Sequence, residues 1–464
     1  MPTREELTML QALPLELKVE RTMQRIREWV DHWGKDHVYV SFSGGKDSTV
    51  LLHIVRQMYG DGIPAVFVNT GLEFPEIQRF VRKFPNVVVL TPEMNFREVL
   101  TRCGYPVISK EVSKCVEETR KWCSKNLNVE SIRQKSNKTV RGRANDAEGR
   151  AADVRDWRIL RDEVVGYRNA GNAGGGATVE PSSLTTSTSY WEQVRILAES
   201  GEAVRCVEKM FGVRRAGEVL MRKASIPSKS RFSSVKYAPL LGADFLISPR
   251  CCDIMKKKSV HRYNKENGMH PMLGTMAAES LLRATAWYKN GCNAFKAGGN
   301  STPMAFWMDQ DVLKYIVDNG LEIPGVYGEI VPDEEHAQIS MLHNFEGRLR
   351  CTGVDRSGCM YCPFGAGHES VREEGRFIRL ARNYPKQYAY IMGGGAYDPE
   401  DGYWKPTKEG LGFAHVFDEI NRLIPTKTDR PYIRYRPEGD EMERARALAE
   451  SKNTEVITWE NRSM

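Results

Sequence analysis

The chain lacks any apolar run near the roughly 18 residues that a membrane-spanning helix needs, which excludes a helical membrane protein. Its first residues, Met1 to Glu6, carry acidic side chains and no apolar stretch, so they do not resemble a secretory signal. Neither sign of charge dominates, because 67 Lys and Arg residues stand against 60 Asp and Glu residues, a formal +7. This mild excess permits a polyphosphate or nucleic-acid ligand and requires neither. We expect a cytoplasmic protein with no membrane partner.

Composition also excludes a disordered chain, a collagen-like chain and a disulfide framework. Of the 464 residues, 41% are hydrophobic and 27% are charged, as in ordinary globular proteins. This length predicts roughly two to four domains. The ten cysteines do not indicate disulfides in a reducing compartment, and most are expected to be small buried hydrophobic residues.

Hydrophobic periodicity predicts the fold of the first quarter of the chain. Residues 19–33 carry apolar side chains every three or four positions, which is typical of an amphipathic helix. Runs with strand character then alternate with helical ones, at 37–42, 49–58, 63–68, 76–83 and 86–90. This alternation implies a parallel sheet covered by helices on its faces. We therefore expect an α/β fold with a doubly wound, mostly parallel sheet.

A glycine turn, Ser43–Ser48 (Ser-Gly-Gly-Lys-Asp-Ser), joins the first of these strands to its helix. Gly44 and Gly45 allow a tight turn and close approach of a ligand, and the first helical amides attract anions. Lys46 adds a positive charge. The spacing differs from the P-loop of kinases because Asp47 follows the lysine, where it could cap the helix or help hold Mg²⁺. An ordinary strand-to-helix turn is the alternative.

This string resembles the signature of the PP-loop ATP pyrophosphatases, the adenine nucleotide α-hydrolase superfamily. Residues 68–76 (Val-Asn-Thr-Gly-Leu-Glu-Phe-Pro-Glu) are similar to the second motif of phosphoadenosine phosphosulfate reductases. Residues 274–283 are similar to the Gly-x-Arg-x-x-x-Ser-x-x-Arg segment of that family. The resemblance covers residues 37–123 and 236–390 and implies that Lys46 and Asp47 are catalytic. The implied nucleotide-binding residues are Ser41, Ser43, Gly44, Gly45, Lys46, Asp47, Ser48, Thr70, Gly71, Gly274 and Arg283.

Four cysteines form a second signal, namely the adjacent pair Cys251 and Cys252 and the later pair Cys359 and Cys362. Four thiolates are the usual ligands of a [4Fe–4S] cluster or a structural zinc. Adjacent cysteines fit one tetrahedral zinc poorly, which favours the cluster and leaves zinc as the alternative. Assimilatory adenylyl-sulfate reductases carry a similar Cys-Cys pair and C-x-x-C, and the resemblance implies a [4Fe–4S] cluster on these four residues. A buried cysteine beside an unrelated zinc knuckle is the other interpretation.

Two departures from the reductase pattern bear on the activity. Met276 stands where the family has the first arginine of its Gly-x-Arg segment. No cysteine follows Cys362, whereas the reductases use a thiol near their C-terminus as the nucleophile. The resemblance therefore implies an enzyme of this superfamily without the usual attacking atom.

Three functions remain open. The first is ATP-dependent sulfur transfer, as in tRNA thiolases and DNA phosphorothioation proteins. In this function the acceptor is adenylated, and sulfur then displaces AMP. The candidate acceptor is a nucleic acid. The implied partner is a cysteine desulfurase, or a thiol or electron donor. The second is reduction of adenylyl sulfate or its 3′-phosphorylated form to sulfite, with Cys351 as nucleophile. The third is a non-catalytic nucleotide-sensing module with a structural metal site.

Composition along the chain predicts six segments. They are an N-terminal helical segment (1–34), the PP-loop core, first part (35–123), a charged and partly flexible helical insertion (124–235), the core, second part (236–345), a cysteine lobe (346–395) and a C-terminal tail with a helix (396–464). The insertion contains a Gly, Ser and Thr-rich stretch at 169–189, typical of a flexible loop. In the second part of the core we expect a strand at 243–248 and helices at 277–284 and 309–317. Residues 377–390 are expected to form one helix.

Overall fold

The computed structural model describes residues 2–126, 205–211, 234–333, 347–369, 375–424, 426 and 430–437. The chain forms two compact units, and each unit consists of two segments of sequence. Unit 1 contains Met1–Asn95 and Cys252–Met360, and unit 2 contains Phe96–Cys251 and Tyr361–Met464. The predicted flexible stretch at 169–189 and the predicted helix of the C-terminal tail, at 441–449, lie outside the described residues. In the part of the chain that is described, no helix has the length and apolar character to cross a membrane.

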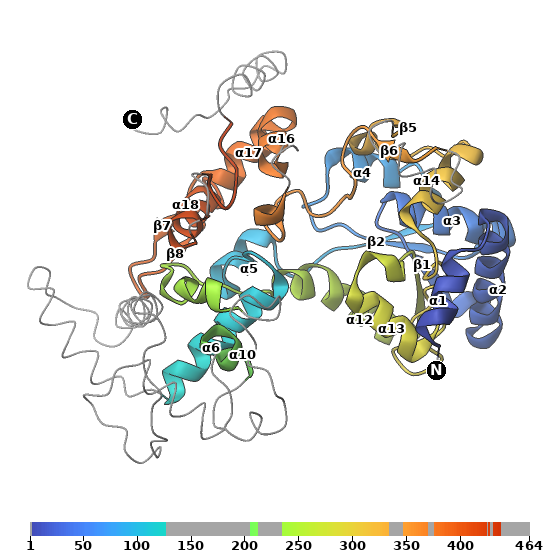
Figure 1. Cartoon of the computed structure of the whole chain (residues 1–464), viewed down its shortest axis with the longest axis horizontal. Coiled ribbons are helices and arrows are strands. Elements are labelled where there is room, and N and C mark those ends of the chain that lie inside the picture. Colours follow the sequence, from blue (N-terminus) through green and yellow to red (C-terminus); the bar gives the residue numbers. More distant parts are fainter. Residues whose placement is uncertain are drawn as a thin grey trace, which may run out of the picture. The chain divides into compact units, whose positions relative to one another are not determined.

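Unit 1 is built around a four-stranded parallel sheet in the order β3-β2-β1-β4. Figure 1 labels its two central strands, β1 and β2. The strands are β1 (Val38–Ser41), β2 (Ala65–Val68), β3 (Val87–Leu90) and β4 (His270–Leu273). In the ladder, Val40 of β1 lies opposite Ala65 on one side and Met272 on the other. Since β2 and β3 extend the sheet on one side of β1 and β4 on the other, the strand order reverses between β1 and β4. The predicted doubly wound α/β fold is confirmed.

Helices cover both faces of this sheet. They are α1 (Arg4–Gln11), α2 (Leu15–Trp33), α3 (Lys46–Tyr59), α4 (Pro75–Val81), α12 (Lys258–Asn267), α13 (Leu281–Asn290) and α14 (Asp309–Asp318). Alternate side chains of β1 point to opposite faces. Val38 and Val40 belong to the large apolar core that also contains residues of α2, α3 and α14. Tyr39 instead packs edge-on against Tyr263 of α12, and its hydroxyl donates to Asn264 at 2.8 Å.

The fourth strand is not the one that the sequence predicted. Residues 243–248 form two isolated bridges in unit 2, at Phe245 and Ile247, so the prediction of a strand there was wrong. The strand beside β1 is β4, which contains Pro271. Proline cannot donate to a ladder and is tolerated at a sheet edge, and β4 lies at the edge of this sheet.

Unit 2 is mainly helical. Its elements are α5 (Phe96–Cys103), α6 (Lys110–Asn126), α10 (Arg205–Phe211), α16 (Arg376–Asn383), α17 (Pro385–Met392), α18 (Phe413–Leu423) and the two-stranded pair β7 (Ala396–Tyr397) and β8 (Trp404–Lys405). The helix expected at 377–390 is divided into α16 and α17 because Pro385 removes a donor and restricts Tyr384 before it. The buried Arg120 of α6 donates to four backbone carbonyls between Leu240 and Phe245, which fixes that segment on α6.

A buried ion pair joins α2 to α14 in unit 1. Lys18 Nζ lies 2.6 Å from Asp311 Oδ2, and the two side chains are 2% and 8% exposed. The same carboxylate accepts a hydrogen bond from the amide of Met308 at the start of α14. Removing one partner of such a pair leaves an uncompensated buried charge, which is strongly destabilising.

We therefore expect Lys18→Met to lower the free energy of unfolding by about 3–5 kcal/mol, measured by urea denaturation. The control is Lys314→Met, since Lys314 is 53% exposed and lies 3.6 Å from Asp318. That exposed pair should change the same quantity by less than about 1 kcal/mol. Equal losses in the two variants would show that the buried pair has no special role.

Candidate functional site

The loop between β1 and α3 lies at the carboxyl end of β1, where the strand order reverses. In open α/β sheets ligands bind at this position. Helix α3 begins at Lys46, and its N-cap, Gly45, has no side chain to satisfy the first amides. Two serine hydroxyls shape the loop instead: Ser48 Oγ accepts from the amide of Ser43 at 3.2 Å and donates to the carbonyl of Gly45 at 2.9 Å. Ser43 Oγ accepts from the amide of Gly45 at 3.3 Å.

Three glycines allow this loop to pack closely. Gly44 has φ +71°, and a Cβ there would lie 2.7 Å from a methyl group of Val81. A Cβ on Gly45 would lie 3.0 Å from Ser357 Oγ. A Cβ on Gly274, just after β4, would lie 2.9 Å from the carbonyl oxygen of Asp47. The predicted loop and the predicted Gly274 therefore meet at one place, the carboxyl ends of β1 and β4.

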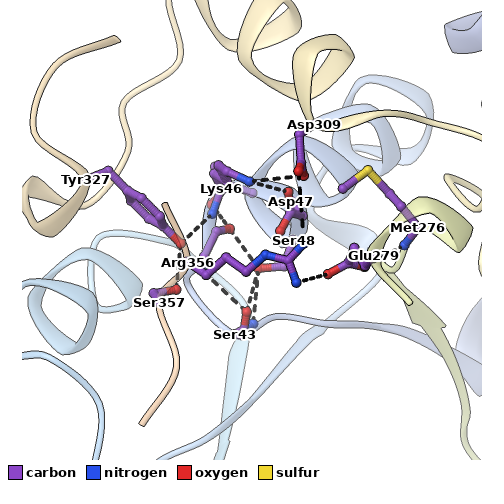
Figure 2. A network of polar contacts seen from close by, with 12 residues as sticks. Ser43, Lys46, Asp47, Ser48, Met276, Glu279, Asp309, Tyr327, Arg356 and Ser357 are labelled. Carbon is purple, nitrogen blue, oxygen red and sulfur yellow. Dashed lines mark hydrogen bonds and ion pairs between the residues drawn. The ribbon is translucent and has the colours of Figure 1, made fainter. Parts of the chain in front are cut away.

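Lys46 holds a buried positive charge in this loop (Figure 2). The residue is 5% exposed, and its Nζ lies 3.2 Å from Asp47 Oδ1 and 3.7 Å from Asp309 Oδ1. Burial lowers the pKa of Lys46, but the carboxylates of Asp47 and Asp309 more than offset this, and the net pKa is raised. The ammonium therefore stays charged and close to any group bound by the loop amides. Asp309 begins α14 and was missed in the sequence because no local pattern links it to the loop.

A second set of charges lies beside Lys46. The Glu279 carboxylate accepts a hydrogen bond from the Met276 amide at 2.8 Å and forms ion pairs with Arg283 and Arg356. Burial lowers the pKa of Arg283, and repulsion from the Arg356 guanidinium lowers it further. The predicted Arg283 thus belongs to the site. Met276 is buried and brings no charge.

Tyr327 closes the loop from another part of unit 1. Its hydroxyl accepts a hydrogen bond from the Lys46 amide at 3.3 Å and lies 2.5 Å from Ser357 Oγ. Burial raises the pKa of Tyr327, so the hydroxyl is neutral. Neither residue was predicted, and their distance from the loop in sequence left no signal that could have identified them.

The second predicted motif follows β2. Thr70 donates to Glu73 through its amide at 3.0 Å and through its hydroxyl at 2.7 Å, and Gly71 takes φ +74°. Lys256 Nζ lies 3.5 Å from Glu73 Oε1. Burial lowers the pKa of Lys256, but Cys359 and Glu73 more than offset this, and the net pKa is raised. Thr70 and Gly71 follow the carboxyl end of β2, which is parallel to β1, so they lie at the same end of the strands as Ser41, the last residue of β1. The Thr70 hydroxyl is engaged within its own turn.

The four predicted metal ligands are divided between the units. Cys252 and Cys359 belong to unit 1, and Cys251 and Cys362 belong to unit 2. All ten cysteines are free thiols. Within the described ranges, no group of three or more Cys, His, Asp or Glu side chains is arranged to hold a metal ion. The [4Fe–4S] cluster, or zinc in its place, stays a prediction, and no chemical step is derived through it.

Tyr327→Phe should lower the free energy of unfolding by about 1–3 kcal/mol, because the Lys46 amide would lose its partner in a buried place. Thermal and urea melting would measure the change. Tyr288→Phe is the matched control, since the part of the chain that the structure describes contains no hydrogen bond of the Tyr288 hydroxyl. A Tyr327→Phe variant as stable as this control would contradict the structural role of the hydroxyl.

Among the comparisons with known proteins, one covers the part of the chain that carries the loop. Residues 37–151 match the family described as the phosphoadenosine phosphosulfate reductase domain. Two uncharacterised proteins of Methanocaldococcus jannaschii are each 32% identical over 102 and 104 residues, which is 21% and 22% of this chain and 22% and 20% of theirs. A glutamine-hydrolysing GMP synthase of Thermomicrobium roseum is 44% identical over 54 residues, 12% of this chain and 10% of that protein.

These matches span about a fifth or less of the relatives' own length. The family match begins at the residue before β1 and includes the strand–turn–helix unit that carries the loop. Residues 37–151 thus match a family of the PP-loop superfamily, the phosphoadenosine phosphosulfate reductase domain, and the parallel sheet with its reversal at β1 agrees with that match.

Proposed function

We propose that unit 1 binds ATP and adenylates an oxygen atom of an acceptor, as the activating half of a sulfur transfer. One observation carries the proposal: the first turn of α3 presents its amides at the reversal of strand order, beside the buried charge of Lys46. Helix amides and a lysine ammonium are suited to the phosphates of a nucleotide.

The residues of the loop would act by binding and orienting the phosphates. The amides of Asp47 and Ser48, in the first turn of α3, would hold the phosphate that leaves, and the Lys46 ammonium would offset its growing negative charge. Asp47 and Asp309 both lie within 4 Å of that ammonium. Mg²⁺ is commonly held by one or two carboxylates together with substrate phosphates, so this pair suits a Mg²⁺ ion that would neutralise phosphate charge.

In the proposed reaction the acceptor oxygen forms a bond to the α-phosphorus of ATP. The bond from that phosphorus to the bridging oxygen of the β-phosphate breaks, and pyrophosphate leaves towards Gly44 and Gly45. A sulfur nucleophile, supplied by a cysteine desulfurase or another thiol donor, would then form a bond to the acceptor atom that carries the adenylated oxygen. The bond from that atom to the oxygen would break, and AMP would leave with the oxygen. The net charge of +7 supports a nucleic acid as the acceptor.

The reductase alternative depends on Cys351, the thiol that the sequence offered as nucleophile. Cys351 ends β6 (Leu349–Cys351), which pairs with β5 (Ile330–Pro332), and the residue is 7% exposed within the apolar core. Burial raises the pKa of its thiol, although the nearby Lys46 opposes this. The thiolate is the nucleophilic form, so a buried thiol with a raised pKa supports adenylation over reduction.

The proposal predicts that the protein releases pyrophosphate from ATP when a nucleic-acid acceptor is added. Lys46→Met should lower this rate by about 10²-fold, because a charge that stabilises the leaving phosphate is lost. Lys265→Met, at an exposed position on α12, should leave the rate unchanged. Sulfite release from adenylyl sulfate with a thiol reductant, without pyrophosphate release, would favour the reductase. Nucleotide binding with neither reaction would favour the sensing module.

Metal content tests the remaining cofactor prediction. Protein purified without oxygen should contain about four iron and four sulfide per chain if a [4Fe–4S] cluster is bound. Replacing Cys359 and Cys362 by serine should abolish that iron. Stoichiometric zinc without sulfide would establish the alternative metal, and protein without either would contradict both.

A further inference from the structure

Arg356 lies next to the loop although it is distant from it in sequence. It precedes Ser357, whose Oγ is 2.5 Å from the Tyr327 hydroxyl, and that hydroxyl accepts from the Lys46 amide. The backbone around it is held to unit 1 as well, because the amide of Gly353 donates to the carbonyl of Tyr327 at 2.8 Å. Arg356 is therefore held one residue before Ser357, which contacts the hydroxyl that binds the Lys46 amide (Figure 2).

The guanidinium of Arg356 is close to two carboxylates without being hydrogen-bonded to either. Its Nη1 lies 3.7 Å from Glu279 Oε1, and its Nη2 lies 4.0 Å from Asp309 Oδ2. Both separations exceed a hydrogen-bond length, and the side chain is 58% exposed. The planar fork of donors is thus positioned by charge and still available to an anion.

The neighbouring charges indicate where that anion would lie. Asp309 faces Lys46 with one oxygen, at 3.7 Å, and Arg356 with the other, at 4.0 Å. The Lys46 ammonium and the Arg356 guanidinium therefore lie on the two oxygens of one carboxylate. On its other side it shares Glu279 with Arg283, which places two guanidinium groups around a single carboxylate. Because one carboxylate balances two guanidinium groups, a second anionic group beside them would relieve the repulsion that remains.

We infer that Arg356 binds the anionic group that follows the α-phosphate of the bound nucleotide, the β-phosphate of ATP or the sulfate of adenylyl sulfate. The inference rests on the proposed nucleotide binding and adds to it the residue that distinguishes ATP or adenylyl sulfate from AMP. Both of these nucleotides carry a second anionic group on the α-phosphate, and separate titrations with each show which of them Arg356 binds.

The test compares the affinities of AMP, ATP and adenylyl sulfate in Mg²⁺ buffer, measured by isothermal titration calorimetry. Arg356→Gln should weaken binding of ATP or adenylyl sulfate by about 10- to 100-fold, the usual loss for a hydrogen-bonded charge pair. Binding of AMP should change by less than about 2-fold. Arg356→Lys should recover part of the loss, since it keeps the charge but not the fork.

Arg262→Gln is the matched control, because Arg262 is an exposed arginine of unit 1 that pairs with Glu93. It should leave all three affinities unchanged. Unchanged ATP and adenylyl sulfate binding in Arg356→Gln, or an equal loss for AMP, would overturn the inference and leave the proposed function standing. A wild-type protein that binds none of the three nucleotides would overturn both. If Arg356→Gln melts at a lower temperature than the wild type, Arg356→Lys takes its place, provided that its melting temperature is unchanged. The deciding quantity is then the loss of affinity for ATP or adenylyl sulfate divided by the loss of affinity for AMP.

Discussion

The candidate site depends on backbone amides that an α-helix cannot satisfy within itself. Helix α3 begins with glycine at its N-cap and directly follows a central strand of a parallel sheet. This arrangement directs polar N–H groups, and the positive end of the helix dipole, to the carboxyl ends of β1 and β4, where the strand order reverses. Ser43 and Ser48 engage the groups that shape the turn, and Tyr327 accepts from the amide of Lys46. The charged side chains beside the loop can act together with these amides on one ligand only because the turn holds a fixed conformation.

Around that turn, positive and negative side chains are balanced. Lys46, Arg283 and Arg356 lie among the carboxylates of Asp47, Glu279 and Asp309. Each cation therefore has a partner before any ligand arrives, which reduces the cost of keeping a buried lysine charged. A polyanionic ligand must compete with these carboxylates, and a divalent cation that occupied them would free the basic groups. With this balance, a site rich in acidic residues still suits the phosphate ligand that we propose.

The parts of the site that are local in sequence could be predicted, and the parts that depend on tertiary contacts could not. The string Ser43–Ser48 stands between a strand signal at 37–42 and a helical signal at 49–58, so its position in the fold could be predicted. Asp309, Tyr327 and Arg356 reach the loop from separate segments, and single residues of common types give no periodic signal. The fold was predictable for β1, β2 and β3, whose apolar runs are uninterrupted. The prediction missed β4, because Pro271 is unfavourable in a strand unless that strand lies at the edge of a sheet.

The division of each unit into two segments has a consequence for synthesis on the ribosome. The first three strands of the sheet end at Leu90, but the partner on the other side of β1 begins only at His270. At about 5–20 residues per second, a nascent chain would take roughly 10 to 40 s to supply β4. During that interval β1 would present an unpaired edge, which is the kind of edge that recruits foreign strands. A fragment that stops before His270 would keep that edge permanently.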